Sequence, residues 1–206
     1  MRLRSSVAAA TIALTALSFV ATTGPARAEC DPDEVIFEDD FEFHDISWGQ
    51  PSETVYVKDG ALLIKDGWGQ VNFQTMADEA DVCVDITILE AAKIDENPAS
   101  IAFWWKDWDN YYDFKYWATG GYVIERIRNG RPTRLLEYTE TDAIKKGLGQ
   151  TNSFQIRLRP KDATIIANGT QLTRFKGQPP QDGGVIGFRS YGLSKFDNLV
   201  VSELFE

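Results

Sequence analysis

Short apolar or alternating segments recur along this chain, and turn residues separate them. No stretch after residue 28 keeps the spacing of an amphipathic helix. Turn signals such as Lys58-Asp59-Gly60, Asn129-Gly130 and Asn168-Gly169 lie between the segments. The pattern predicts strands over residues 55–57, 61–64, 82–89, 100–105, 111–117, 122–127, 134–138, 154–158, 164–167, 185–190 and 199–204. Residues 141–146 are the one helical candidate, and we expect a short turn there at most.

Many short strands at this spacing are typical of an all-β sandwich or barrel. No internal repeat and no linker divides the sequence, and residues 29–206 are enough for one domain with a sizeable core. We therefore predict a single β-sandwich domain over 29–206.

Residues 101–117, IAFWWKDWDNYYDFKYW, are the most aromatic part of the chain. Two aromatic runs flank an Asp/Asn-rich turn, which predicts an antiparallel hairpin. Side chains alternate between the two faces of a strand. On the second strand, Tyr112, Phe114 and Tyr116 form an apolar face suited to the core. A mixed face opposes it, with Tyr111, Asp113, Lys115 and Trp117.

Mixed aromatic and charged rows suit sugars, because rings stack on a pyranose while charged groups take its hydroxyls. On the first strand of the hairpin, side-chain alternation places Trp104 on the mixed face and Ile101, Phe103 and Trp105 on the other face. Alternation also puts Arg189 and Tyr191 on the face opposite to Ile186 and Phe188, so they can join the mixed face. Arg126 is a weaker candidate for the same face. The predicted ligand-binding residues are Trp104, Trp108, Asp113, Lys115, Trp117, Arg126, Arg189 and Tyr191. The alternative is that loops cover this face and its tryptophans belong to the core.

Residues 1–28 have the features of a secretory signal peptide. Arg2 and Arg4 precede an apolar run over 7–21, and Ala26-Arg27-Ala28 forms a small-x-small cleavage site. We expect an exported protein, periplasmic or extracellular, that begins near Glu29 and inserts no helix into the membrane.

Cys30 and Cys83 are the two cysteines of the chain. In an exported protein a pair of this kind favours a disulfide, which would tie the mature N-terminus to the strand around Cys83. The alternative leaves Cys83 as a small buried hydrophobic residue.

The charge balance argues against nucleic acid as a partner. Without residues 1–28 the chain has 18 Lys+Arg and 31 Asp+Glu, a formal charge of −13. An acidic surface mainly promotes solubility, although it is also compatible with calcium binding.

Several motifs, in order, resemble a known superfamily. They are Phe37-Glu38-Asp39-Asp40-Phe41, Lys58-Asp59-Gly60-Ala61-Leu62, Asn110-Tyr111-Tyr112-Asp113-Phe114, Asn129-Gly130, Gly183-Gly184-Val185-Ile186-Gly187-Phe188 and Phe196-Asp197-Asn198-Leu199-Val200-Val201. Over residues 36–204 they look like the concanavalin A-like lectin/glucanase jelly roll, in the branch of laminin G-like and keto-disaccharide hydrolase-like domains. The resemblance implies two curved antiparallel sheets, with a glycan on the concave face.

Laminarinase-type relatives carry Glu-x-Asp-x-x-Glu on one strand, and this chain has no such run. Its nearest analogue is Asp81, Asp85 and Glu90, of which Asp81 and Asp85 share a parity and Glu90 does not. The single histidine, His44, is expected in a loop. No zinc spacing or phosphate-binding glycine loop is present, so we assign no catalytic residue.

The resemblance also implies a possible structural calcium ion that joins the first strand, the first hairpin and the last strand. The matching positions are Glu38, the Gly60 carbonyl and Asp197. The alternative is that Asp197 and Asn198 bond to loop backbone.

We therefore expect a carbohydrate-binding, lectin-like sandwich that recognises a glycan or glycoside. One alternative is a glycoside-acting enzyme similar to the keto-disaccharide hydrolases, although residues 95–100 replace that group's Asn-Ser-Gly segment. The other is an envelope structural or protein-interaction module. Carboxylates about 5–9 Å apart in a cleft would favour the enzyme.

Overall fold

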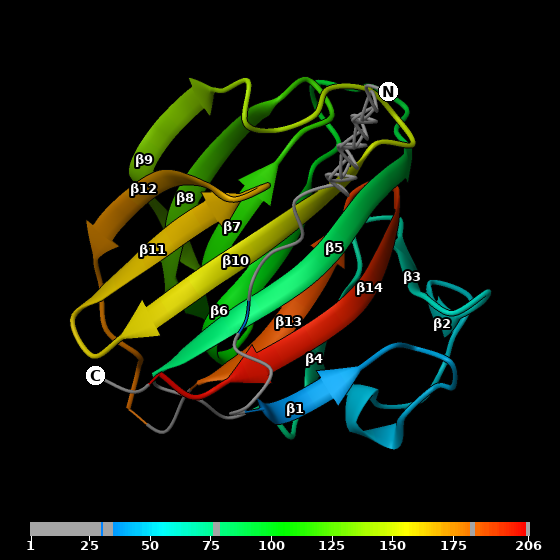
Figure 1. Ribbon diagram of the computed structural model, residues 1–206, viewed down its shortest axis with the longest axis horizontal. Helices are drawn as coiled ribbons and strands as arrows, with labels where there is room; N and C mark the ends of the chain where they lie inside the picture. The colour runs from blue at the N-terminus through cyan, green and yellow to red at the C-terminus, as the bar shows by residue number, and fades with distance from the viewer. Residues whose placement is uncertain (1–29, 31–34, 76–78, 182–183, 205–206) are drawn as a thin grey trace, which may run out of the picture.

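The computed structural model describes residue 30 and residues 35–75, 79–181 and 184–204. It is a sandwich of two antiparallel sheets, as predicted, and Figure 1 shows the larger sheet in front of the smaller one. Among the described residues, no helix is long and apolar enough to cross a membrane. The predicted signal peptide lies outside the described residues.

The larger sheet has the strand order β12-β11-β10-β5-β14-β3-β2, and β1 pairs with β14. Its strands are β1 (Val35–Asp39), β2 (Val55–Val57), β3 (Leu62–Lys65), β5 (Ala80–Glu90), β10 (Thr151–Arg159), β11 (Asp162–Ala167), β12 (Thr170–Lys176) and β14 (Leu193–Ser202).

The smaller sheet has the order β4-β13-β6-β7-β8-β9. Its strands are β4 (Gly69–Asn72), β6 (Ala99–Asp107), β7 (Asn110–Tyr116), β8 (Gly121–Arg128), β9 (Arg131–Glu140) and β13 (Val185–Ser190). A one-turn 3-10 helix, η2 (Ile46–Trp48), follows β1.

Aromatic side chains from both sheets meet in the core. Phe114 of β7 lies 5.1 Å from Phe154 of β10, and Phe188 of β13 stacks on Phe196 of β14 at 4.6 Å between ring centroids. Trp48 of η2 stacks on Phe188 at 5.3 Å and is fully buried. The short helix therefore closes one part of the core.

Most predicted strands are confirmed, and β2 and β13 have the predicted bounds. Asn129-Gly130 and Asn168-Gly169 are hairpin turns in which each residue has a positive φ. Sequence analysis missed β4 and β12, because β4 is short and flanked by glycine, and because β12 is an exposed edge strand without a clear apolar face. Residues 141–146 form turns and no helix.

Candidate functional site

The outer face of the smaller sheet carries the mixed row that strand parity predicts on β7. Tyr112, Phe114 and Tyr116 belong to the core, whereas Tyr111 packs with Ala102 and Ile127 in a separate cluster. The outer face therefore combines a small apolar cluster with charged side chains.

Trp104 lies in the core, so its predicted place on the mixed face is wrong. Its φ of +47° marks a β-bulge in β6, where the pairing with β7 shifts between Phe103 and Asp107. An extra residue in a strand reverses the alternation that follows it. Trp104 thus contacts Tyr112 edge-on at 5.1 Å, and Trp105 packs on the outer face, against the predicted parity.

Four rings form what we call the aromatic row, which comprises Phe73, Trp105, Trp108 and Tyr111. Successive centroids are 6.5, 5.7 and 5.4 Å apart, and every contact is edge-on. Such contacts fix the orientation of each ring. Trp108 nevertheless keeps 40% of its surface exposed, so it can present a ring to a ligand.

A pocket of about 300 Å³ lies beside this row, and we call it the tryptophan pocket. It is lined by Asp66, Gly67, Trp68, Gly69, Trp108, Tyr111 and Arg189. A Cβ at Gly69 would lie 2.6 Å from the Trp108 ring, so a glycine is needed for the indole to rest against β4. Sequence analysis missed Trp68, Gly69 and Asp66. The usable signal was a tryptophan between two glycines in a turn, and its side chain is exposed.

Arg189 is held in place on the wall of the tryptophan pocket. Its Nε donates to the Gly67 carbonyl at 3.0 Å, and its guanidinium lies 4.7 Å from the centroid of the Tyr191 ring. Arg189 and Tyr191 thus lie together, as predicted from their parity. A guanidinium fixed in this way loses little entropy when it binds a ligand oxygen.

Two further groups give the tryptophan pocket hydrogen-bonding capacity. Burial raises the pKa of Tyr111 to about 12, so its hydroxyl stays protonated at neutral pH and can donate. The Asp66 carboxylate is exposed, lies 3.9 Å from Lys65 and can accept. The pocket therefore combines exposed indole rings with donors and an acceptor.

Asp113 and Lys115 belong to a charged cluster next to this pocket. Asp113 lies directly opposite Glu125 of β8, and Lys115 Nζ is 3.4 Å from Asp113 Oδ2 and 2.6 Å from Glu125 Oε2. Burial raises the Asp113 pKa, and the positive charges of Lys115 and Arg189 oppose that rise. Burial by itself would lower the Lys115 pKa, but the two carboxylates raise it. Neither Asp113 oxygen accepts a hydrogen bond of good geometry from a described residue.

Arg126 lies on the core side of the smaller sheet, not on the mixed face, because it pairs directly with Tyr112 across β7 and β8. Its side chain reaches a second pocket, of about 290 Å³, at the end of these strands. We call this the arginine pocket, and it is lined by residues 110–112, 126–128 and 178–181. Tyr111 lines both pockets.

Trp117 follows β7 at the end opposite to Tyr111. Its ring contacts Tyr138 edge-on at 5.6 Å, and its side chain is partly buried. It lines neither the tryptophan pocket nor the arginine pocket. A binding role for Trp117 stays a prediction.

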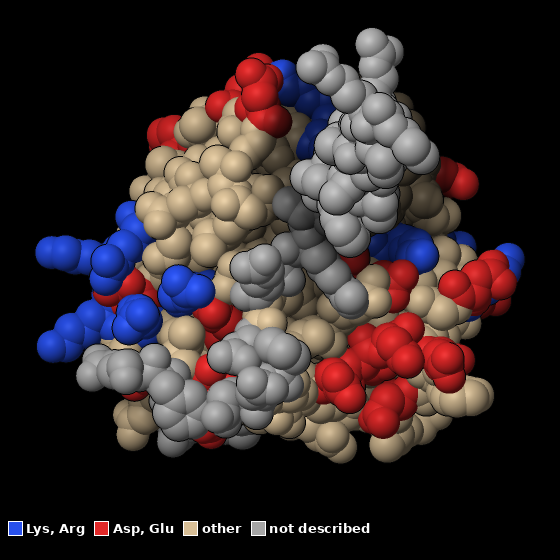
Figure 2. Space-filling model, viewed as in Figure 1, with Lys and Arg blue, Asp and Glu red and all other residues tan. Residues whose placement is uncertain are grey.

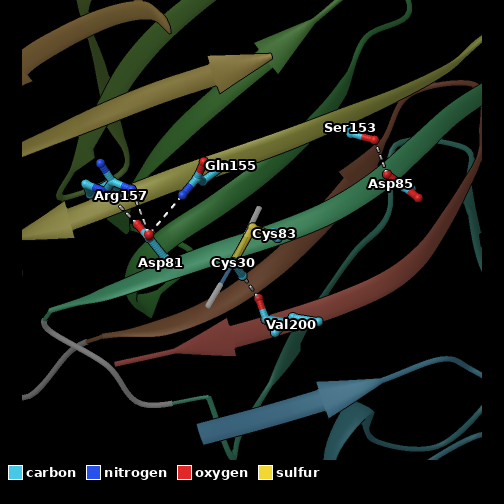
Figure 3. Close-up of a disulfide and its surroundings, with 8 residues drawn as sticks. All are labelled: Cys30, Asp81, Cys83, Asp85, Ser153, Gln155, Arg157 and Val200. Atoms are coloured by element: carbon cyan, nitrogen blue, oxygen red, sulfur yellow. Dashed lines mark hydrogen bonds and ion pairs between the residues drawn. A yellow bond between two sulfur atoms is a disulfide. The ribbon is translucent and has the colours of Figure 1, made fainter. Parts of the chain in front are cut away.

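The carboxylates of β5 lie on the outer face of the larger sheet (Figure 3). Arg157 donates to Asp81 through Nε and Nη2, each at 3.0 Å, and Gln155 Nε2 donates to it at 2.8 Å. Asp85 accepts hydrogen bonds from Ser153 and Asn198. Asp81 and Asp85 therefore lie on the same face of β5, as predicted. Their hydrogen bonds to neighbouring side chains form a structural network.

The predicted disulfide between Cys30 and Cys83 is present on this same face (Figure 3). His44 lies in the loop after β1, as expected, where its Nε2 donates to the Gly49 carbonyl at 2.9 Å.

Acidic side chains gather over β1 and the segment after it, and basic side chains lie toward the β11–β12 edge (Figure 2). A pocket of about 330 Å³ near β1 is lined by Glu38, Asp39, Asp40, Asn198, Leu199 and Val200. Asp197 lies 3.1 Å from Lys195 and accepts from the Asn198 amide. Within the described ranges no three His, Cys, Asp or Glu side chains could hold a metal ion.

Calcium at Glu38, the Gly60 carbonyl and Asp197 stays a prediction, and thermal melting in calcium and in chelator would check it.

No protein-family model matches this chain, and no curated protein matches it in sequence. Solved structures are similar in fold. The β-glucanase of Bacillus licheniformis has a TM-score of 0.61 at 12% identity, covering 82% of this chain and 98% of its own. The carbohydrate binding module CBM66 from Bacillus subtilis has 0.54 at 13%, covering 75% and 90%. A variant of human galectin-16 has 0.52 at 14%, covering 67% and 96%.

These similarities show the fold of the chain. The fold is a concanavalin A-like jelly-roll sandwich, as the motif order in the sequence predicts.

Proposed function

We propose that this protein binds a glycan or glycoside in the tryptophan pocket on the outer face of the smaller sheet. The observation that carries the proposal is the exposed ring of Trp108, held edge-on by its neighbours above Gly69 and beside the fixed guanidinium of Arg189. A rigid ring gives stacking area at low entropic cost, and the adjacent donors can form hydrogen bonds with the hydroxyl groups of a sugar.

Two kinds of similar structure support a sugar as the ligand class. One is described as a carbohydrate binding module and another as a β-glucanase. Because their sequence identity to this chain is low, these structures support only the class of fold. The residues of the tryptophan pocket carry the argument for the site.

We also propose that the protein is exported. A disulfide persists in oxidising compartments, and the predicted signal peptide would deliver the chain there. The N-terminal residue of the mature secreted protein, determined by sequencing, would check the predicted cleavage before Glu29.

A glycan-array screen of the mature protein, followed by calorimetry with Trp108→Ala, tests the binding proposal. We expect Trp108→Ala to weaken binding by about tenfold or more, roughly 1.4 kcal/mol. Phe43→Ala is the matched control, since Phe43 is an exposed ring outside both pockets. Equal affinities of the two variants would overturn the proposed site.

One observation favours a glycoside-acting enzyme as the second candidate. Asp113 and Glu125 lie on one face of adjacent strands, both near Lys115, and carboxyl groups with different environments can divide acid and base roles. Asp113 is fully buried, however, and neither carboxylate lines a described pocket. Release of reducing sugar by the wild type, lost in Glu125→Gln, would support hydrolysis; no release would leave binding alone.

A further inference from the structure

The arginine pocket is a positively charged site on an acidic protein. The chain has 31 Asp+Glu and 21 Lys+Arg, yet Arg126 and Arg128 line this pocket and no described Asp or Glu does. Cations usually find carboxylate partners in a chain of this composition. A pocket whose described lining holds two arginines and no acidic residue therefore lacks the carboxylates that would neutralise its charge.

Neither guanidinium has a partner among the residues that the structure describes. Arg134, Arg157 and Arg174 all form ion pairs, but no ion pair or hydrogen bond joins the side chain of Arg126 or Arg128 to another described residue. The Arg126 Nε is moreover buried from solvent without an acceptor. A buried donor left unpaired destabilises the protein without ligand, and a ligand oxygen in the pocket would satisfy this donor.

The location of the arginine pocket links it to the proposed glycan site. Tyr111 lines both this pocket and the tryptophan pocket, so the two pockets meet at the start of β7, and a ligand that passes round this end of the sheet can contact both. The volumes, about 290 and 300 Å³, each lie at the lower limit of the usual range for small-ligand sites. A sugar on Trp108 would then extend a substituent or a neighbouring sugar toward Arg126 and Arg128.

We propose that the arginine pocket binds an acidic group of the glycan, a carboxylate or a sulfate ester, and so makes the protein selective for acidic sugars. This inference rests on the proposed function of the tryptophan pocket. The planar guanidinium matches an oxyanion with two parallel hydrogen bonds, which is stronger and more directional than a contact with a neutral hydroxyl.

The negative charge of the whole chain does not prevent such binding. Repulsion between separated charges is screened beyond about 8 Å at physiological ionic strength, whereas the two arginines act at contact distance. We therefore expect selectivity for short oligosaccharides in which one acidic group enters the arginine pocket.

The experiment compares three probes by calorimetry, namely a uronate oligosaccharide, its carboxyl-reduced neutral counterpart and a sulfated oligosaccharide. The wild type should bind at least one acidic probe about tenfold more tightly than the neutral one. Arg128→Gln should reduce that preference to about twofold or less, and Arg126→Gln should do the same if it folds. The acidic probe whose affinity falls in Arg128→Gln shows whether the pocket binds a carboxylate or a sulfate ester.

Arg131→Gln is the matched control, because Arg131 is exposed, lies on the same β8–β9 hairpin and does not line the pocket. It should keep the full preference; an equal loss in Arg131→Gln would show a general charge effect and overturn the inference. Equal wild-type affinity for acidic and neutral probes would overturn the inference while leaving the proposed function intact. Binding to no probe here and to no glycan in the array would overturn both.

Discussion

Single small residues decide where the aromatic side chains of the smaller sheet can lie. Gly69 leaves the space in which the Trp108 ring rests, and the Phe188 carbonyl oxygen of β13 lies 3.3 Å from where a Cβ would stand. Trp108 is partly exposed, so it can move away at little cost to the fold. A Cβ atom at position 69 would thus change the binding surface more than it would change the stability of the fold.

Gly69→Ala should therefore displace the Trp108 indole and weaken glycan binding by about tenfold, while the free energy of unfolding changes by about 1 kcal/mol or less. Calorimetry and urea denaturation measure the two effects. In the Trp108→Ala background the same glycine change should have no further effect on binding. A full additional loss in that background would show that Gly69 acts independently of the indole.

Asp113 shows how burial sets the charge of a side chain. The carboxyl group lies beside Lys115 but is fully buried, and burial raises its pKa. The folded state thus retains the proton at pH values where the unfolded chain has lost it. Because the native state then binds more protons, this group makes the folded state less stable as the pH rises from about 3.9 through the raised pKa.

Asp113→Asn should remove that contribution, which has a slope of at most about 1.4 kcal/mol per pH unit within this window. Urea denaturation at a series of pH values, with the variant compared with wild type, measures it. Asp162→Asn is a control of opposite sign, since the Arg174 contact lowers the Asp162 pKa and its stabilisation is lost as the pH falls. Parallel pH profiles for wild type and Asp113→Asn would contradict the prediction.

At the scale of elements, the bulge in β6 determines which tryptophans are available to a ligand. The register changes at Trp104, so Trp104 turns inward while Trp105 packs on the outer face beside Trp108. The β6–β7 hairpin then carries Trp108 back over the outer face to β4. One inserted residue in one strand therefore produces both a core tryptophan and an aromatic row.

Trp104→Ala should destabilise the protein by about 3–5 kcal/mol, because it leaves a cavity between Phe103 and Tyr112. Trp108→Ala should cost about 1 kcal/mol or less, because the ring is partly exposed. Urea denaturation of the two variants gives the comparison. Similar losses of stability in both would contradict the assignment of core and surface.

At the scale of the whole molecule, the disulfide ties Cys30 to the middle of the larger sheet. Its cysteines are 53 residues apart in sequence, and Cys83 lies on β5 between strands β10 and β14. The cross-link restricts the unfolded chain far more than the folded one. On the chain-entropy model it stabilises the native state by about 4 kcal/mol at most.

Reduction, or replacement by Cys30→Ser with Cys83→Ser, should lower the free energy of unfolding by about 2–4 kcal/mol. Denaturation with and without reductant measures the loss. The double variant should not respond to reductant, which controls for other effects of the reagent. Unchanged stability of the reduced wild type would show that the N-terminal tie contributes nothing.

Local patterns in the sequence determined most of the strands, the hairpin turns and the sides of β7. Period-two alternation depends on the strand itself, and Asn129-Gly130 or Asn168-Gly169 needs only its own backbone to form a turn. The disulfide followed from the number of cysteines and the predicted export. These features need no knowledge of which strands become neighbours.

Only the tertiary structure decided which side chains form a site. The tryptophan pocket joins the β3–β4 turn, the β6–β7 turn and β13, which are far apart in sequence. The inward turn of Trp104, the core-side position of Arg126 and the burial of Asp113 depend on pairing with other strands. Register and bulges are set by the packing energy of the whole sheet, so the sequence of a single strand does not contain them.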